Sequence, residues 1–252
     1  MLKTRVIPSL LLRNKGLVKT VQFKNATYVG CPINAIKIFN DKEVDELIFL
    51  DITATPENRD PPFSLIAEIA SECFMPFGYG GGIRSLDDIR KLFRLGAEKV
   101  IINTYAAENP TFVKQASDLY GSQSIVVSLD VEKNFLGKHI VFTHGGMCNT
   151  NLEAVKYAVQ MQEMGAGELF LNSIDRDGTM KGYDIGLVKR VSSAVDIPVI
   201  ACGGAGKLQH FADAVKLGGA SAVSAGSFFV FHGRYRAVLI TYPSIHELEA
   251  VL

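Results

Sequence analysis

The chain has 252 residues, 48% of them hydrophobic, and its 26 basic and 26 acidic residues cancel. This balance provides no basic surface for nucleic acid or anionic lipid, and no apolar run is long enough to span a membrane. The segment MLKTRVIP reads as the start of a strand rather than a signal peptide, so we expect a cytoplasmic protein.

Strand and helix patterns alternate along the whole chain. We expect eight strands, at residues 5–11, 46–52, 75–79, 99–103, 124–130, 168–172, 197–201 and 222–225. Helices are expected at 33–42, after Pro61-Pro62, between a capping box at 85–88 and Gly96, near Pro110, and at 152–164, 185–195 and 208–217. Residues 13–32 read as a long polar loop and residues 131–149 as a hairpin on the rim. The prediction is one closed (β/α)8 barrel over residues 1–252.

An internal repeat divides this barrel into two halves, roughly residues 1–121 and 122–252. Residues 80–104 align without a gap with residues 202–226, at an offset of 122. The glycine pair, the helix and the following strand all recur, which indicates a twofold duplication.

The run SIVVSLD at 124–130 predicts a buried strand that ends on a carboxylate at the catalytic mouth. Its counterpart is VIPSLL at 6–11, at an offset of 119. Asp130 is therefore a candidate acid/base in one half, whereas the equivalent residue in the other half is Leu11.

Glycine runs follow the third and seventh strands, at 80–82 and 203–204. Glycine lets backbone amides approach an anion, and each run opens a helix whose N-terminus favours negative charge. Asn103-Thr104 and Ala225-Gly226-Ser227 add donors at the neighbouring strand ends. Tight turns alone would explain a single glycine pair, but recurrence in both halves favours two phosphate sites. We therefore predict an elongated substrate with a phosphate at each end.

Charged residues mark both ends of the predicted barrel. Four lie near the starts of strands, and so at the bottom: Arg5, Glu46, Lys99 and Glu168. A solvated ring of salt bridges is the ordinary explanation for them. Three carboxylates lie at or just past strand ends, on the catalytic face: Asp51, Asp130 and Asp177. None has a metal-ligand spacing with histidine, so we expect neither a metal nor another cofactor.

The four cysteines, Cys31, Cys73, Cys148 and Cys202, lie far apart and form no CxxC motif. We expect four buried, reduced thiols.

Five motifs carry a resemblance to a known family: FLDITAT (49–55), GGGIRS (80–85), INTYAAENP (102–110), SIDRDGT (173–179) and GGAGK (203–207). With them the chain resembles the cyclase (HisF-type) subunit of imidazole glycerol phosphate synthase, from Met1 to at least Phe231. A sister isomerase barrel shares the duplicated fold, but not SIDRDGT together with GGAGK.

The resemblance implies a heterodimer with a glutaminase (HisH-type) subunit docked on the barrel bottom. Ammonia then crosses the barrel and reacts at the top with a bisphosphorylated ribulosyl intermediate, giving imidazole glycerol phosphate and an aminoimidazole carboxamide ribotide. The four bottom residues match the ammonia gate of the family, and Asp130 matches one of two catalytic aspartates. Implied substrate contacts are Lys19 of the first loop, Gly82, Asn103 and Thr104 for one phosphate, and Asp177, Gly178, Gly204 and Ala225 for the other, with Asp51 and Gly226 beside them.

The second catalytic aspartate of the family falls on Leu11, which cannot transfer a proton, although ring closure needs two positioned groups. The first loop, SLLLRNKGLVKT, is also apolar where members read like CLDVKDGRVVKG, and Asn172 and Cys202 replace small hydroxyl residues. Two hypotheses follow. The chain is a lyase-type cyclase of histidine biosynthesis, or it is a paralogue that conducts ammonia for amidination of a surface-polysaccharide sugar, with the acceptor held by a separate sugar amidotransferase.

Overall fold

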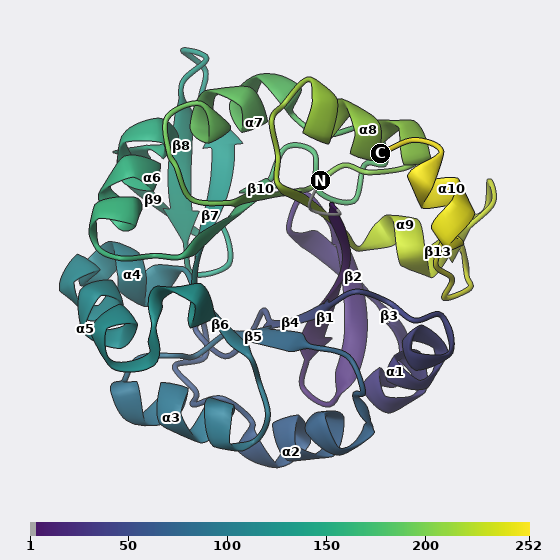
Figure 1. Cartoon of the computed structure of the whole chain (residues 1–252), viewed down its shortest axis with the longest axis horizontal. Coiled ribbons are helices and arrows are strands. Elements are labelled where there is room, and N and C mark those ends of the chain that lie inside the picture. The colour runs from purple at the N-terminus through teal and green to yellow at the C-terminus, as the bar shows by residue number, and fades with distance from the viewer. Residues whose placement is uncertain (1–3) are drawn as a thin grey trace.

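The computed structural model describes residues 4–252, and parallel strands form a closed barrel at its centre. Around the barrel the strands are β1 (Arg5–Arg13), β4 (Leu47–Asp51), β5 (Phe77–Gly80), β6 (Lys99–Ile102), β7 (Ile125–Lys133), β10 (Glu168–Ser173), β11 (Val199–Cys202) and β12 (Ala222–Ala225). Pairing of β12 with β1 closes the ring. Helices surround the strands on the outside (Figure 1). The predicted single (β/α)8 barrel is confirmed.

The helices are α1 (Pro32–Asp41), α2 (Phe63–Glu72), α3 (Leu86–Arg94), α4 (Thr104–Glu108), α5 (Pro110–Tyr120), α6 (Ala154–Glu163), α7 (Ile185–Ser192), α8 (Leu208–Lys216), α9 (Ser227–Val230) and α10 (Ile245–Glu249). Helix α3 begins at the expected capping box, in which Ser85 and Asp88 each accept a hydrogen bond from the other's backbone N–H. A short 3-10 helix, η1 (Ser122–Ser124), precedes β7. None of the described helices is long and apolar enough to cross a membrane.

The core has two parts because the barrel strands are covered on both faces. The larger part packs the strands against the helices. A smaller cluster fills the barrel interior with the side chains of Ile7, Ile48, Ile101, Val126, Phe170 and Ile200, together with Cys202 and Ala222. This interior layer separates the bottom of the barrel from its mouth.

The loop predicted at residues 13–32 is wrong, because two strands occupy most of it. Strand β2 (Gly16–Val21) pairs antiparallel with β1, and β3 (Lys24–Gly30) pairs with β2. The turn between them places Gln22 at φ 51° and Phe23 at φ 60°. Two-residue turns of this kind favour asparagine or glycine, so the sequence carried no turn signal here.

The hairpin predicted at residues 131–149 is confirmed, and it occupies the equivalent place in the second half. Strand β7 continues into it, β8 (His139–Thr143) pairs antiparallel with β7, and β9 (Cys148–Glu153) pairs with β8. A last small hairpin, β13 (Phe231–His232) and β14 (Ala237–Val238), follows α9.

The expectation of four buried thiols is correct only for Cys202. Cys31 and Cys148 are exposed and Cys73 is half-buried, although all four are free. Cys31 precedes α1 and Cys148 begins β9, so both lie at element ends, where the chain meets solvent.

Candidate functional site

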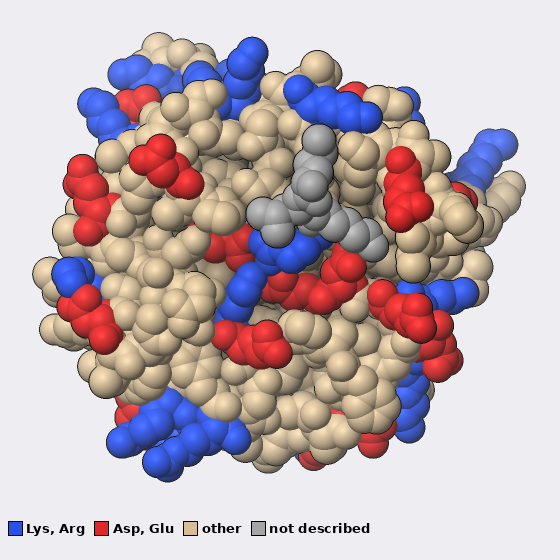
Figure 2. Space-filling view, viewed as in Figure 1, with Lys and Arg blue, Asp and Glu red and all other residues tan. Residues whose placement is uncertain are grey.

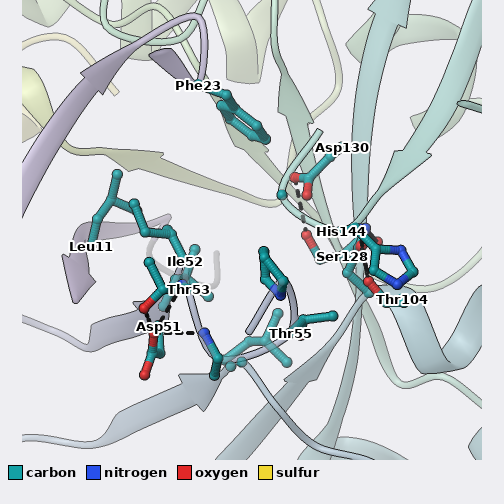
Figure 3. Close-up of a pocket in the computed structure, with 18 of the residues that line it drawn as sticks. Leu11, Phe23, Asp51, Ile52, Thr53, Thr55, Thr104, Ser128, Asp130 and His144 are labelled. Carbon is teal, nitrogen blue, oxygen red and sulfur yellow. Dashed lines mark hydrogen bonds between the residues drawn. The ribbon is translucent and has the colours of Figure 1, made fainter. Parts of the chain in front are cut away.

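A cavity of about 560 Å³ occupies the end of the barrel where the strands finish. Its wall combines apolar side chains, such as Leu50 and Phe170, with polar groups from most of the strand ends. Leu11 and Asp130 project from opposite sides of it, and the ring of Phe23 lies over it (Figure 3). Leu11 and Asp130, which occupy equivalent positions in the internal repeat, therefore line the same cavity.

Asp130 is the carboxylate best placed for proton transfer. Burial raises its pKa to about 7, a hydrogen bond from the Asn172 amide lowers it, and the nearby charge of Asp177 raises it further. The Ser128 hydroxyl lies 3.5 Å from Oδ1 of Asp130. A carboxyl group with this pKa exchanges protons near neutral pH, as an acid/base should.

Lys19 also reaches the cavity, from β2 rather than from a loop. Its side chain is buried, and Nζ donates a hydrogen bond to the carbonyl oxygen of Ser9. Burial lowers its pKa to about 8, against the opposing effect of the Asp177 carboxylate. Leu11 provides no titratable group on this wall.

Asp51 is the last residue of β4, and its side chain holds the loop that follows β4. Its Oδ1 accepts hydrogen bonds from the backbone N–H groups of Thr53 and Ala54 at 3.0 Å, and from the Thr53 hydroxyl. Oδ2 lies 3.5 Å from the guanidinium of Arg59. The side chain is 1% exposed, so Asp51 positions this loop and Arg59.

The first predicted phosphate site borders the cavity as expected. Gly82, Asn103 and Thr104 all line it. The Asn103 side-chain amide donates to the carbonyl oxygens of Ser128 and Phe142, which leaves it no further side-chain donor for a ligand. Asn103 therefore holds the β6, β7 and β8 ends together. The backbone N–H of Gly82 donates to the Thr55 hydroxyl at 3.3 Å.

The second predicted phosphate site is only partly brought to the cavity. Asp177 and Gly226 line it, whereas Gly178, Gly204 and Ala225 do not. The carbonyl oxygen of Gly204 accepts a hydrogen bond from Gly182 at 2.7 Å. The two glycine runs are therefore similar in sequence, but only the run at 80–82 lines the cavity.

Arg59 and Arg84 line the first site and were not predicted from the sequence. Arg84 follows the glycine run within GGGIRS, so its position was a usable signal. Arg59 lies in a loop that carried none. No group of three or more histidine, cysteine, aspartate or glutamate residues within 4–252 could hold a metal ion.

The four charged residues at the bottom form one connected cluster. Arg5 pairs with both Glu46 and Glu168, and Lys99 Nζ lies 3.3 Å from Glu46 and 2.8 Å from Glu168. Burial lowers the pKa of Arg5, but the charges of Glu168 and Glu46 outweigh burial, so it lies above its ordinary value. Figure 2 shows acidic and basic side chains gathered at the centre of one face.

Both glutamate side chains of this cluster are only 5% exposed. The cluster is therefore a partly buried plug at the end where strands begin, and not a solvated surface ring.

The profile of the family described as "Histidine biosynthesis protein" matches residues 5–236. A relative from Pseudomonas aeruginosa, "Putative imidazole glycerol phosphate synthase subunit hisF2", is 53% identical over 99% of this chain and 99% of its own length. Another from Vibrio vulnificus, "Putative imidazole glycerol phosphate synthase subunit hisF3", is 47% identical over 100% of this chain and 97% of its own. One from Leptospira borgpetersenii, "Putative imidazole glycerol phosphate synthase subunit HisF", is 44% identical over 100% and 99%.

Proposed function

The chain belongs to the histidine biosynthesis protein family, as a divergent paralogue of its HisF-type cyclase subunits, and on this premise we propose that it uses ammonia released by a glutaminase subunit. The glutaminase docks on the bottom face, ammonia crosses the barrel, and the acceptor is bound in the cavity at the top. The observation that carries this proposal is the plug of Arg5, Glu46, Lys99 and Glu168, which closes the bottom of a barrel whose cavity opens at the other end.

The barrel interior supports transfer of neutral ammonia. Between plug and cavity the lining is apolar, formed by residues such as Ile48, Val126 and Phe170. Bringing an ammonium ion into such a layer carries a large desolvation cost, whereas neutral ammonia pays much less. The plug then acts as the gate at which the charged form is excluded.

The first candidate acceptor is the bisphosphorylated ribulosyl intermediate, so that the chain forms imidazole glycerol phosphate as a cyclase subunit. The cavity, Asp130 and the glycine run at Gly82 support this candidate. The second candidate is a conduit that supplies ammonia for amidination of a surface-polysaccharide sugar. Leu11 favours the second, because only one of the two expected proton-transfer groups is present.

Glutaminase activation tests the common part of both candidates. The cognate glutaminase should co-purify with this chain and hydrolyse glutamine faster in its presence. Lys99→Met should reduce ammonia transfer, because the plug loses the cation between its two carboxylates, and the exposed Lys156→Met is the matched control. A glutaminase that neither binds nor accelerates would refute both candidates.

Turnover of the bisphosphorylated substrate with excess ammonium separates them. The cyclase candidate expects a wild-type rate near 1 s⁻¹, in the ordinary range of about 1–10³ s⁻¹. The conduit candidate expects none. A rate that appears in Leu11→Asp but not in Leu11→Asn would show that the missing proton-transfer group is what limits cyclisation.

A further inference from the structure

The cavity wall includes one histidine, His144. All five histidines of the chain lie within residues 4–252, and His144 is the one that lines the cavity. It directly follows β8, in the turn that leads to β9, and its backbone has a left-handed φ of 54°. The backbone N–H of His144 donates to the Thr104 hydroxyl at 3.0 Å. Because Thr104 begins α4, this bond fixes the turn to the segment that follows β6.

The pairing of β7 with β8 brings His144 to the same wall as Asp130. Asp130 is paired with Phe142, and continuing this antiparallel register by two residues places position 144 across from Ser128. The Ser128 hydroxyl in turn lies 3.5 Å from the Asp130 carboxylate. Figure 3 shows Ser128, His144 and Asp130 on one side of the cavity, opposite Leu11. Two titratable side chains therefore lie on the Asp130 wall, although the repeat position on the other wall carries leucine.

The imidazole of His144 has a hydrogen-bond partner at one nitrogen and is open at the other. Nδ1 lies 3.2 Å from the Thr143 hydroxyl. Nε2 lies 3.8 Å from Oε1 of Glu108, which also lines the cavity. This distance is too long for a hydrogen bond, but it is short enough for the carboxylate to stabilise a protonated imidazole. The His144 side chain is 33% exposed, so solvent can restore its protonation state between turnovers.

We infer that His144 is the second proton-transfer residue of the cavity: it acts as the general base, and Asp130 as the general acid, when ammonia adds to the acceptor. In this arrangement Nδ1 of His144 donates to the Thr143 hydroxyl, and Nε2 carries the lone pair that accepts the proton. The inference rests on the cyclase candidate of the proposed function. His144 supplies from the Asp130 wall the group that Leu11 lacks, so ring closure does not need an aspartate at position 11.

Protons and electrons balance in this addition. The nitrogen of ammonia forms a bond to the carbonyl carbon of the ribulosyl group while the π bond of the carbonyl breaks. Asp130, whose pKa of about 7 keeps part of it protonated at neutral pH, gives its proton to the oxygen, and His144 takes one proton from the nitrogen. The product is a neutral carbinolamine. Its nitrogen and oxygen are bonded to the same carbon, which suits a base and an acid on one wall.

Loss of water from the carbinolamine restores both residues. The proton on His144 moves to the new hydroxyl group, the C–O bond breaks and water leaves. The Asp130 carboxylate then takes a proton from the nitrogen and leaves a neutral imine. The net change is replacement of the carbonyl oxygen by NH with release of one water molecule. Glu108 faces the imidazolium while it is charged.

Turnover of the bisphosphorylated ribulosyl substrate by the isolated chain with excess ammonium tests the inference. His144→Asn removes the base but keeps the left-handed backbone, which asparagine adopts readily. Its kcat should fall about 10²–10⁴-fold, the usual cost of a lost general base, with KM within about 3-fold of the wild-type value. The matched control, His246→Asn, changes an exposed histidine of α10 and should leave both constants unchanged.

Three readouts separate a base from a structural residue. The rate of the wild type should have a bell-shaped pH profile. His144→Asn should lose the acidic limb, which the base creates, and keep the basic limb, which the protonated Asp130 creates. Added imidazole should restore part of kcat to His144→Asn. Leu11→Asp should also restore part of it, because the new carboxylate supplies a base.

Diethyl pyrocarbonate tests the same residue without a substitution, since it carbethoxylates accessible imidazoles. Loss of wild-type turnover should follow modification of His144, located by peptide mass spectrometry. No wild-type turnover, a His144→Asn rate equal to that of the wild type, a change in KM alone, or no rescue by either imidazole or Leu11→Asp would each overturn the inference. Glutaminase activation is measured separately. Its loss would refute the proposed function, whereas intact activation without turnover would refute this inference and leave the use of ammonia standing.

Discussion

Asp130 lies within β7, between the amide of Asn172 and the hydroxyl of Ser128, in a cavity where the facing position is Leu11. Burial brings the pKa of Asp130 to about 7 and that of Lys19 to about 8, so both groups can change protonation near neutral pH. Both residues could be selected from the sequence. Their altered pKa values could not, because each arises from burial by segments distant in the chain.

Asp130 should make stability depend on pH. Its folded pKa of about 7 exceeds the unfolded value, so between about pH 4 and 7 the folded state keeps a proton that the unfolded state has lost, and stability falls as pH rises. In Asp130→Asn the free energy of unfolding should not fall in this way. By pH 8 it should therefore have risen by up to about 4 kcal/mol relative to that of the wild type, and by less if water reaches the side chain. Urea denaturation at pH 5 and 8 measures it.

Asp41→Asn is the control, since that carboxylate is exposed on the end of α1. Its stability difference from wild type should be the same at both pH values. An equally flat difference for Asp130→Asn would contradict the raised pKa of Asp130.

The β2–β3 hairpin is the element of the site that differs most from the prediction, because the sequence indicated a loop there. The hairpin at residues 131–149 was recognised from its alternation and from Gly137, which lies in the turn between β7 and β8, whereas Gln22 and Phe23 gave no such signal. The glycine runs and Asp130 were found because they lie within local motifs. The contact between the β2–β3 hairpin and the loop before α7 was not found, because it joins Thr20 and Asp177, which are 157 residues apart in the sequence.

Contact between this hairpin and the loop before α7 predicts a specific cost for Gly178→Ala. Gly178 has φ +67°, and a new Cβ would collide with the Thr20 carbonyl oxygen. We expect destabilisation of about 2–4 kcal/mol, with faster proteolysis within residues 13–30. Gly233→Ala is the control, because Gly233 has φ +70° with no atom within 4 Å of its Cβ position, and should cost only about 1 kcal/mol. Equal costs would mean that the hairpin does not rest on Gly178.

The bottom plug joins strands from around the entire barrel. Arg5 begins β1, Lys99 begins β6, Glu168 begins β10, and Glu46 directly precedes β4. Sequence spacing placed all four at one end, but a solvated ring and a buried plug have the same spacing. Only their side-chain exposure separates the two.

Arg5→Met should destabilise the whole barrel by about 3 kcal/mol, since two buried carboxylates would keep only Lys99 as counter-charge. Arg94→Met, on the exposed face of α3, should change stability by less than about 0.5 kcal/mol. Adding Glu168→Gln to Arg5→Met should recover part of the loss. Denaturant unfolding of the four proteins measures these differences, and a loss below about 1 kcal/mol for Arg5→Met would show that the cluster behaves as a surface network.

The two hairpins cross between the halves of the chain. The β2–β3 hairpin grows from the first half and rests on Asp177 of the second, while the β8–β9 turn, from the second half, donates from His144 to Thr104 of the first. Each half of the chain thus supplies a cover for the mouth of the other half. A mutation in one hairpin can therefore change what the opposite half accepts while the glycine run of that half stays intact.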